Sequence, residues 1–369
     1  MASFSKGSGY SKSDLIDSGT PLILYGRLYT KYETVITEVD TYAEEKKGSV
    51  FSKGGEVIVP ASGETAEDIS VASVVEKSEV LLGGDLNVIT PSEVLESMFL
   101  ALNITYGKAH KDMSKLAQGK SVVHLHNADL KTIVLQYPSI LEQRKICEFF
   151  KSLDNLITLH QRQCEALKKQ KRFFLQNMFP KEGESEPRIR FNGFTEPWEQ
   201  RKLGELVNFL DTQRKPLEES KRKKGPYPYY GASGIVDYVS DYIFDRELIL
   251  LSEDGANITD RNYPVCFLAS GKYWVNNHAH VLECKAENDN NFICISLERK
   301  DFKKFNTGMA MPKLNKETCK IIPVSCTSLE EQTKIGNFFR ELETNITLHQ
   351  RELDSLKKLK KGLLQNMFV

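Results

Sequence analysis

Two histidine pairs in this chain have a spacing that metal sites use. His124 and His126, like His278 and His280, are separated by one residue, which puts both imidazoles on one face of a strand. No cysteine, aspartate or glutamate at ligand spacing completes either pair. We therefore interpret both pairs as ordinary polar strand positions and predict no metal site.

A second set of residues could be arranged as a nuclease triad. Glu283 and Lys285 form a Glu-x-Lys tripeptide about thirty residues after Asp254, an order that can hold a divalent metal. Such a tripeptide is common by chance, and an ion pair at a strand end explains it more simply. The chain also has no Walker loop, no nucleophile motif and no complete S-adenosylmethionine motif. The sequence predicts a non-catalytic protein that binds no cofactor.

Other residues favour binding to nucleic acid. The basic run Lys221–Lys224 is followed at once by Gly225–Gly231, in which tyrosines alternate with turn residues. Basic and aromatic side chains on one loop suit contact with phosphates and bases. Asn257, Arg261 and the segment Asn276–His278 supply amide, guanidinium and imidazole groups of the kinds that read base edges.

The elements that position these residues are organised by an internal repeat. Residues 142–179 and 331–368 align without a gap at an offset of 189, with 22 of 38 positions identical. The match continues upstream more weakly and pairs Leu125 with Leu314. Two copies of so long a period predict a pseudo-two-fold molecule in which two variable domains alternate with two constant segments.

The constant segments, 139–179 and 328–369, are predicted to be long helices. Each opens with a Ser-x-x-Glu capping box, and apolar residues then recur every 3.5 positions, which is typical of a coiled coil. Each helix needs a partner for this seam, and the nearest matching one is its own copy. The seam residues are Ile146, Phe150, Leu153, Ile157, Leu167, Ile335, Phe339, Leu342, Ile346 and Leu356.

The variable regions, 1–138 and 180–327, have the pattern of mixed α/β domains, and residues 180–187 have the composition of a linker. Short β-branched runs predict strands within both regions. These runs are residues 55–60, 121–125, 247–252, 292–296 and 320–325.

Composition limits the class of protein. The 369 residues carry 50 basic and 50 acidic side chains, so bulk charge does not indicate a nucleic-acid binder. The first variable region has 13 basic and 18 acidic residues, a net charge of −5. No run approaches the roughly 18 apolar residues of a membrane span. Seven cysteines without a Cys-x-x-Cys pair favour buried thiols in a reducing compartment, so we expect a cytoplasmic protein.

Three motifs together resemble a known family. Each constant helix carries Glu-Gln-x-Lys-Ile, Phe-Phe and Leu-His-Gln-Arg in the same order. Residues 187–205 resemble a lead-in to a target recognition domain, and residues 309–315 resemble the segment that precedes the constant helix. The chain resembles the specificity subunit of a type I restriction–modification system over nearly its whole length. One departure is that Phe4 already matches Phe209, so the first domain lacks a lead-in.

The resemblance implies an α+β fold of two target recognition domains, 1–138 and 180–327, separated by two antiparallel helices. It implies a subunit that reads a bipartite DNA target, one half-site per domain, and that docks two methyltransferase subunits and two motor-nuclease (restriction) subunits. S-adenosylmethionine, ATP and magnesium are then expected on those partners. The candidate DNA contacts are Lys6, Lys12, Arg27, Tyr29, Lys31, Lys221, Arg222, Lys223, Lys224, Tyr227, Tyr229, Tyr230, Asn257, Arg261, Asn276, Asn277 and His278.

Two other functions remain open from the residues alone. The charge of −5 on the first variable region suits a scaffold whose two domains bind other proteins rather than DNA. The order Asp254, Glu283, Lys285 leaves a stand-alone nuclease as a second alternative.

Overall fold

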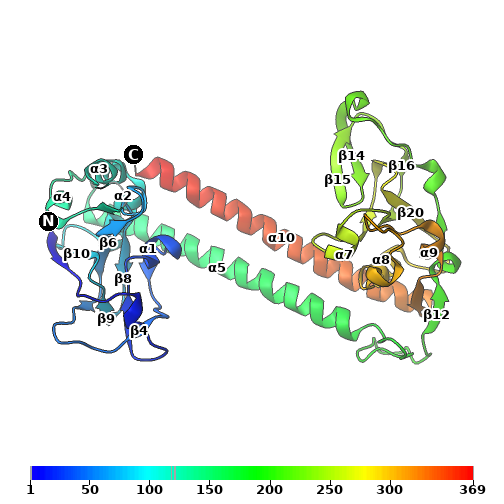
Figure 1. The fold of residues 1–369 in the computed structure, drawn as a ribbon, viewed down its shortest axis with the longest axis horizontal. Helices are drawn as coiled ribbons and strands as arrows, with labels where there is room; N and C mark the ends of the chain where they lie inside the picture. Colours follow the sequence, from blue (N-terminus) through cyan, green and yellow to red (C-terminus); the bar gives the residue numbers. More distant parts are fainter. Residues whose placement is uncertain (1, 118, 120–121, 369) are drawn as a thin grey trace. The chain divides into compact units, whose positions relative to one another are not determined.

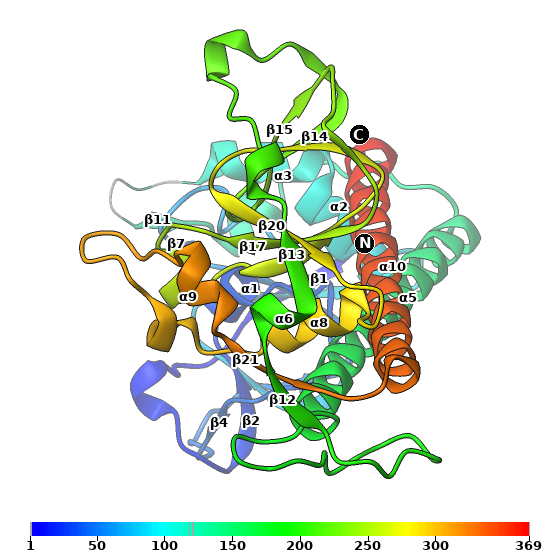
Figure 2. The same ribbon diagram turned by 90° about the vertical axis from the view of Figure 1, so that its right-hand side faces the viewer.

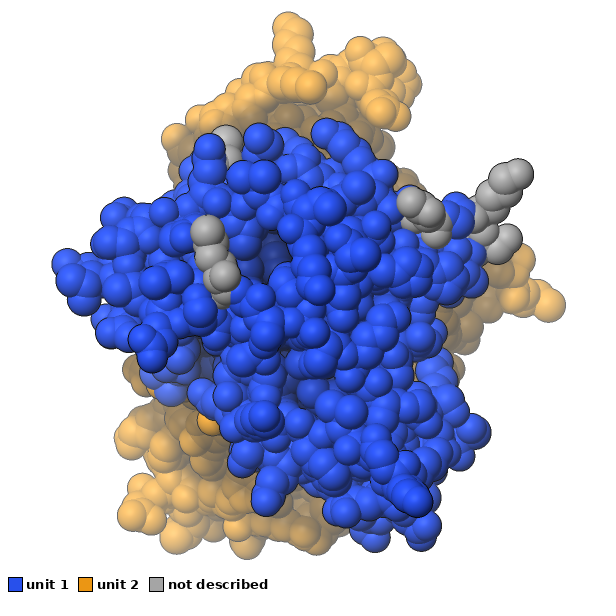
Figure 3. Space-filling view, turned by 90° about the vertical axis from the view of Figure 1, so that its left-hand side faces the viewer, with its two compact units in different colours: residues 1–161, 351–369 blue, residues 162–350 orange. Residues whose placement is uncertain are grey.

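The computed structural model describes residues 2–117, 119 and 122–368. The chain divides into two compact units, which Figure 3 colours separately. Unit 1 comprises residues 1–161 and 351–369, and unit 2 comprises residues 162–350. Each unit therefore combines one variable domain, the first part of the long helix that follows it and the last part of the other long helix.

Unit 1 contains two main sheets and a short two-stranded one. The five-stranded sheet has the order β1 (Ala2–Lys6), β10 (Leu86–Pro91), β6 (Glu56–Pro60), β8 (Ser73–Val75) and β3 (Val35–Ile36). The four-stranded sheet has the order β4 (Tyr42–Ala43), β2 (Thr20–Ile23), β9 (Ser78–Leu82) and β5 (Phe51–Lys53), and β7 (Ser62–Gly63) pairs with β11 (Val123–His124). The short helices are α1 (Arg27–Thr30), α2 (Ser97–Tyr106), α3 (Lys108–Leu116) and α4 (Asn127–Leu130).

Unit 2 repeats this plan (Figure 2). One sheet has the order β13 (Val207–Phe209), β20 (Ala279–Cys284), β17 (Leu248–Ser252) and β18 (Cys266–Ala269). The other has the order β15 (Gly234–Val239), β14 (Lys224–Gly231), β19 (Lys272–Val275) and β16 (Phe244–Asp245), and β12 (Glu199–Lys202) pairs with β21 (Pro323–Cys326). The short helices are α6 (Leu203–Leu206), α7 (Asn257–Asp260), α8 (Asn290–Glu298) and α9 (Lys316–Lys320).

Six strand pairings correspond between the two units, three in each main sheet, whereas β3–β8 of unit 1 and β12–β21 of unit 2 have no counterpart. In β1 and β13, Phe4 lies opposite Ile89 and Phe209 lies opposite Leu282. The second sheet of each unit contains one parallel pair, β2 with β9 or β14 with β19, inside an otherwise antiparallel arrangement. The predicted α+β fold with two similar domains is confirmed.

The two long helices are α5 (Ile140–Asn177) and α10 (Leu329–Met367), both labelled in Figure 1. Within unit 1, Lys360 Nζ lies 2.5 Å from Asp154 Oδ1, and within unit 2 the Cys164 thiol lies 3.5 Å from Gln350 Oε1. In each unit the residue numbers of the two helices run in opposite directions, so the helices pair antiparallel as predicted.

Within each unit, part of the apolar seam packs between the two long helices. Leu153, Ile157, Leu353 and the half-buried Leu356 pack together in unit 1. Leu342, Ile346, Cys164 and the half-buried Leu167 pack together in unit 2.

The first seam positions of each helix pack instead into the core of a variable domain. Ile146 and Phe150 join the core of unit 1, and Ile335 and Phe339 join that of unit 2. The end of the other helix enters the same core, with Phe368 in unit 1 and Phe179 in unit 2. A seven-residue repeat shows which face of a helix is buried but not what covers that face. The sequence therefore did not distinguish contacts between the long helices from contacts with a variable domain.

Two strand predictions are wrong in part and one is wrong outright. Residues 292–296 lie in helix α8, which Asp289 caps by accepting a hydrogen bond from the Phe292 N–H at 2.8 Å. Most side chains of α8 are buried, including those of the consecutive residues Asn291–Cys294, so its apolar run lacks the periodicity that separates helix from strand. Residues 320–325 are divided between the end of α9 and the start of β21, and of residues 121–125 only β11 is a strand, residue 121 lying outside the described residues.

A buried glutamine joins each long helix to its variable domain. Gln143 Oε1 accepts the N–H of Glu96 at 2.9 Å, and Gln143 Nε2 donates to the Pro138 carbonyl at 2.9 Å. Gln332 makes the matching bonds in unit 2, at 3.1 Å from the Asp289 N–H and 2.8 Å to the Thr327 carbonyl. These contacts explain why the glutamine is identical in the two copies, because it ties the start of α5 or α10 to the N-cap of α2 or α8.

Candidate nucleic-acid interface

The β14–β15 hairpin of unit 2 carries the basic run that the sequence singled out. In Figure 2 this hairpin and the loop before it extend away from β17 and β20 of the same unit. Lys223 and Lys224 are exposed at the start of β14, and within the described chain their ammonium groups form no ion pair. These two lysines therefore present net positive charge to solvent, as a phosphate contact requires.

The other members of this run have structural partners. Lys221 pairs with Glu218 at 2.7 Å, and Arg222 pairs with Asp237 at 3.4 Å. The Arg222 guanidinium also stacks over the Tyr229 ring at 4.7 Å. Tyr229 is only 1% exposed, so its prediction as a DNA contact is wrong. Alternation along a strand buries every second residue, and here Tyr229 faces inward.

Tyr227 and Tyr230 lie on the same strand with different surroundings. Tyr227 is half-buried against Tyr242, with ring centroids 5.1 Å apart. Tyr230 packs against Phe267 and Tyr273, and burial raises its pKa. The Tyr230 ring therefore packs mainly against other side chains of the sheet.

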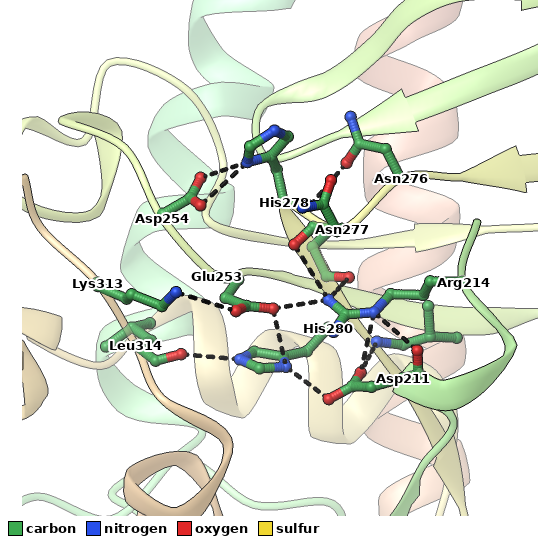
Figure 4. Close-up of polar contacts among 12 residues, drawn as sticks. Asp211, Arg214, Glu253, Asp254, Asn276, Asn277, His278, His280, Lys313 and Leu314 are labelled. Atoms are coloured by element: carbon green, nitrogen blue, oxygen red, sulfur yellow. Dashed lines mark hydrogen bonds and ion pairs between the residues drawn. The ribbon is translucent and has the colours of Figure 1, made fainter. Parts of the chain in front are cut away.

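A network of charged side chains lies beneath the loops of unit 2 (Figure 4). Arg214 Nη1 donates to Glu253 Oε2 at 2.7 Å and to the Ala279 carbonyl at 2.8 Å. Lys313 reaches the other oxygen of Glu253 at 3.4 Å. The network thus ties together chain segments that lie far apart in the sequence.

His280 is the most buried member of this network, at 1% exposure. Its Nδ1 lies 2.8 Å from Asp211 Oδ2, and its Nε2 lies 2.8 Å from the Leu314 carbonyl oxygen. Burial alone would lower the pKa of His280, but hydrogen bonds to Asp211 and to the Cys319 thiol outweigh burial and raise the pKa to about 10. His280 is therefore a cation near neutral pH and donates from both ring nitrogens.

Asp211 is the carboxylate that pairs with the buried His280 cation. Burial raises the pKa of Asp211, but the hydrogen bonds from His280 and the Val281 N–H, together with the positive charges of His280 and Arg214, outweigh burial and keep the pKa below its usual value. The Val281 N–H also donates to Asp211 Oδ1 at 3.0 Å. The sequence analysis did not single out Asp211, Arg214 or Glu253, because their partners are 39 to 69 residues away in the chain.

The network positions the loop that contains Asn276, Asn277 and His278. His278 is half exposed, and its Nδ1 lies 2.9 Å from Asp254 Oδ1. Asn276 is buried and accepts the His278 N–H at 2.8 Å, so it shapes the loop and its prediction as a DNA contact is wrong. Asn277 and His278 are exposed to solvent, and Asp254 orients the His278 ring.

Asn257 and Arg261 of the α7 region are also engaged within the fold. Asn257 Nδ2 donates to the Tyr263 carbonyl at 2.9 Å, and Asn257 Oδ1 accepts the Tyr263 N–H at 2.8 Å. Arg261 has a φ of 57° and pairs with Glu298 at 2.9 Å. Both side chains hold a turn, so they are less available to a ligand than the sequence predicted.

Several exposed residues of unit 2 were missed by the sequence analysis. Tyr238 lies on β15, Tyr263 follows α7, and Met309 and Met311 lie in the segment before α9. All four are large side chains with more than half of their surface exposed. Their exposure depends on which side of each loop faces the core, and no local sequence signal indicates that.

The candidate contacts in unit 1 differ in availability. Lys6 and Lys12 are exposed, and Tyr29 on α1 is half-buried with a pKa raised by burial. Arg27 contacts Asp40 at 2.6 Å and Glu33 at 2.7 Å, and its side chain is only 9% exposed. Arg27 therefore holds a loop, and its two ion pairs leave little of its guanidinium open to a phosphate.

Lys31 is exposed and shares Asp40 with Arg27, at 2.8 Å. Paired acidic groups of this kind reduce the positive potential that phosphate would meet.

The residues of the alternative nuclease triad have separate partners. Asp254 contacts His278, Glu283 pairs with Arg246 at 2.6 Å, and Lys285 donates to the Glu205 carbonyl at 2.8 Å. This arrangement matches the interpretation of Glu283 as a surface ion pair at a strand end. Across the described residues, none of the helices combines the length and apolar character needed to cross a bilayer.

Comparison with known proteins places this doubled fold in a family. The sequence profile of the type I restriction modification DNA specificity domain matches residues 1–169 and again residues 195–358. The profile covers most of the chain, once in each half. The chain therefore belongs to this family.

Individual relatives agree with this assignment. A putative type I restriction enzyme specificity subunit of Haemophilus influenzae, S.HindORF215P, is 38% identical over 133 residues, which is 36% of this chain and 34% of the relative. The MjaVIII specificity subunit of Methanocaldococcus jannaschii is 25% identical over 47% of this chain and 42% of its own length. The putative MjaX specificity subunit of the same organism is 24% identical over 81% of this chain and 74% of its own length. The chain thus matches less than half the length of the first two relatives.

A solved structure shares the fold. The S subunit of a type I restriction–modification system from M. genitalium superposes with a TM-score of 0.68 at 16% identity, over 100% of this chain and 94% of that one.

Proposed function

We propose that this chain is a DNA-recognition subunit of a type I restriction–modification complex, in which each unit reads one half of a bipartite target. The family profile, which matches once in each half of the chain, is the observation that carries this proposal. The main strand pairings of the two units correspond, so equivalent loops in each unit offer a surface for a separate half-site.

The proposed partners are double-stranded DNA, two methyltransferase subunits and two restriction subunits. Exposed Lys223 and Lys224 and the oriented His278 supply the groups by which unit 2 contacts DNA. S-adenosylmethionine, ATP and magnesium belong to the partner subunits in this proposal. The compartment that holds the DNA, the cytoplasm, is the proposed location, and the seven cysteine thiols, which form no disulfide, suit its reducing conditions.

An exchange of domains tests independent reading. Replacing residues 187–327 with the equivalent region of a relative, and co-expressing the chimera with the methyltransferase subunits, should change one half of the methylated target and keep the other. Mapping methylated adenines across a genome measures both halves at once. A target altered in both halves, or in neither, would contradict one half-site per unit.

The proposed role is non-catalytic. The purified chain with S-adenosylmethionine, magnesium or ATP should neither methylate nor cut DNA. Robust activity that Glu283→Ala abolishes would instead support the nuclease alternative.

A further inference from the structure

A short loop of unit 2, residues 306–313, is closed at its base by hydrogen bonds. Asn306 Oδ1 accepts the N–H groups of Gly308 and Lys313, at 2.9 Å and 2.8 Å. A Cβ atom on Gly308 would lie 1.8 Å from the Met311 carbonyl oxygen, so the turn accepts only glycine there. The shape of this loop, which we call the methionine loop, is therefore fixed by its own backbone contacts.

The tip of the methionine loop presents apolar side chains to water. Met309 is fully exposed, and Met311 is 61% exposed. An apolar side chain of this size gains free energy when a partner buries it. Because the loop beneath it is fixed, Met309 can enter a partner without the cost of ordering a flexible segment.

The methionine loop is anchored beside the segment that orients His278. The Gly255 N–H donates to the Pro312 carbonyl at 3.0 Å, and Asp254 forms a β-bridge with Lys313. The Asp254 carboxylate lies 2.9 Å from His278 Nδ1 (Figure 4). One stretch of backbone therefore holds both the exposed imidazole and the methionine loop.

The sequence around the loop is positively charged. Residues 301–316 contain four lysines and one aspartate, a net charge of +3. Lys304 and Lys313 each have an acidic partner at 3.4 Å, whereas the exposed Lys303 forms no ion pair within the described part of the chain. An apolar tip flanked by cations suits duplex DNA, in which phosphates surround an apolar stack of bases.

We propose that Met309 inserts between two stacked base pairs of the half-site that unit 2 reads, an inference that rests on the proposed function. Methionine is one of the apolar side chains that wedge into base steps, and its flexible thioether packs well against aromatic faces. Lys303 and His278 then contact the DNA on either side of the wedge. Selectivity at this step comes from the ease of unstacking, so a pyrimidine–purine step is expected there.

Unit 1 has the same turn with a different residue at its tip. At the offset of 189, Gly119 corresponds to Gly308, and a Cβ atom on Gly119 would lie 1.9 Å from the Val122 carbonyl oxygen. The residue that corresponds to Met309 is Lys120, which lies outside the described residues. A lysine is a strongly hydrated cation and not an apolar wedge. The insertion is therefore expected in the half-site of unit 2 and not in that of unit 1.

Fluorescence of 2-aminopurine tests the insertion. The full-length chain, assembled with its methyltransferase subunits, is mixed with duplexes of the target obtained by methylation mapping, each with 2-aminopurine at one position. This base analogue brightens when it is unstacked, so the signal should rise at one step of the unit 2 half-site. A methyltransferase also unstacks the base that it modifies, and the signal at that base is the internal reference.

Substitutions at the loop tip separate the wedge from other contacts. Met309→Ala should abolish the rise at the inserted step, preserve the internal reference and weaken target binding about tenfold, because the burial of the removed atoms is lost. Met309→Leu should retain most of the signal and the affinity. Met309→Lys, which gives unit 2 the residue of unit 1, should abolish the signal. Ile321→Ala, at another exposed apolar position of unit 2, is the matched control and should change neither quantity.

Unchanged fluorescence and affinity in Met309→Ala, in a complex that still binds its target, would overturn the insertion and leave the proposed function intact. Loss of assembly with the methyltransferase subunits in Met309→Ala would also overturn it, because the loop would then contact a protein. A complex of the unaltered chain that prefers no duplex sequence would overturn both the insertion and the proposed function.

Discussion

Equivalent backbone carbonyls in the two units accept hydrogen bonds from different side chains. Asn87 Nδ2 donates to the Leu125 carbonyl in unit 1, and His280 Nε2 donates to the Leu314 carbonyl in unit 2, both at 2.8 Å. Asn87 and His280 each lie two residues before the strand residue that faces Phe4 or Phe209. The fold therefore requires a donor at this position, since a buried carbonyl without a partner is costly.

The surroundings of the two donors differ in charge. His280 pairs with Asp211, whose equivalent in unit 1 is Lys6. Asn87 Oδ1 is buried without a hydrogen-bond partner among the described residues, so unit 1 tolerates a neutral, incompletely satisfied arrangement. The comparison shows that the shared topology determines where a polar donor must lie. The charge of that donor and of its surroundings differs between the two units. Both tryptophans, Trp198 and Trp274, lie in unit 2, so their fluorescence reports on the unfolding of that unit.

The largest expected effect comes from giving unit 2 the neutral donor of unit 1. His280→Asn should destabilise unit 2 by about 3–5 kcal/mol, because it leaves the Asp211 carboxylate buried without its main partner. Urea unfolding followed by tryptophan fluorescence measures the loss. The control His278→Asn, at a half-exposed position, should change the stability by no more than about 0.5 kcal/mol. Equal effects of the two variants would show that the buried charge pair does not distinguish the units.

Equivalent glutamates should respond differently to the same change. Glu331→Ala should cost about 3 kcal/mol, because it leaves the Arg190 guanidinium without its bidentate partner. Glu142→Ala should stay within about 0.5 kcal/mol, because its side chain is exposed. Hydrogen exchange read separately in the two units provides the measurement. A large loss in unit 1 would mean that Glu142 has a partner in solution.

Gln143 and Gln332, which tie the long helices to the variable domains, should have similar effects when they are substituted. Gln143→Ala and Gln332→Ala each remove bonds to a buried N–H and a carbonyl, so each should destabilise its own unit by about 1–3 kcal/mol. Hydrogen exchange at the starts of α2 and α8 should increase in the matching unit alone. Unequal losses would show that the identical Glu-Gln pairs serve different purposes.

The smallest expected effect, counted per pH unit, is a dependence of the stability of unit 2 on pH. The pKa of His280 is raised in the fold to about 10 from an ordinary value of 6.5, so the folded unit retains a proton that the unfolded chain releases. The stabilisation is complete below about pH 6.5 and is lost as pH rises through about 10, at no more than about 1.4 kcal/mol per pH unit. Urea unfolding at pH 7, 8 and 9 should show this decline in tryptophan fluorescence, and His280→Asn should remove it. A decline that persists in His280→Asn would assign the titration to another group.

Much of the architecture follows from local patterns in the sequence. The offset of 189 predicts two copies, the 3.5-residue repeat predicts both long helices, and Ser139 and Ser328 lie at their starts. Here the serines accept the Glu142 and Glu331 N–H groups at 3.4 Å, as a capping box predicts. The carboxylate of Glu331 binds Arg190 instead of the helix start, so only the serine half of the predicted box explains the motif in unit 2.

The candidate interface was less predictable for a physical reason. Residue type suggested Tyr229, Arg27 and Asn276 as DNA contacts, but exposure depends on strand register and on acidic partners elsewhere in the chain. Lys223 and Lys224 are exposed as predicted, because no acidic group of the fold pairs with them within the described residues. The Asp211–His280 pair joins positions 69 residues apart and leaves no periodic trace.

The sequence by itself determined the doubling and the two long helices, because these depend on repetition and on periodic burial along a continuous segment. Only the tertiary structure decided which polar groups are buried together, and why Glu331 is buried against Arg190 while Glu142 is exposed. Those outcomes arise from contacts between distant segments, whose free energies depend on three-dimensional proximity and desolvation and not on spacing along the chain.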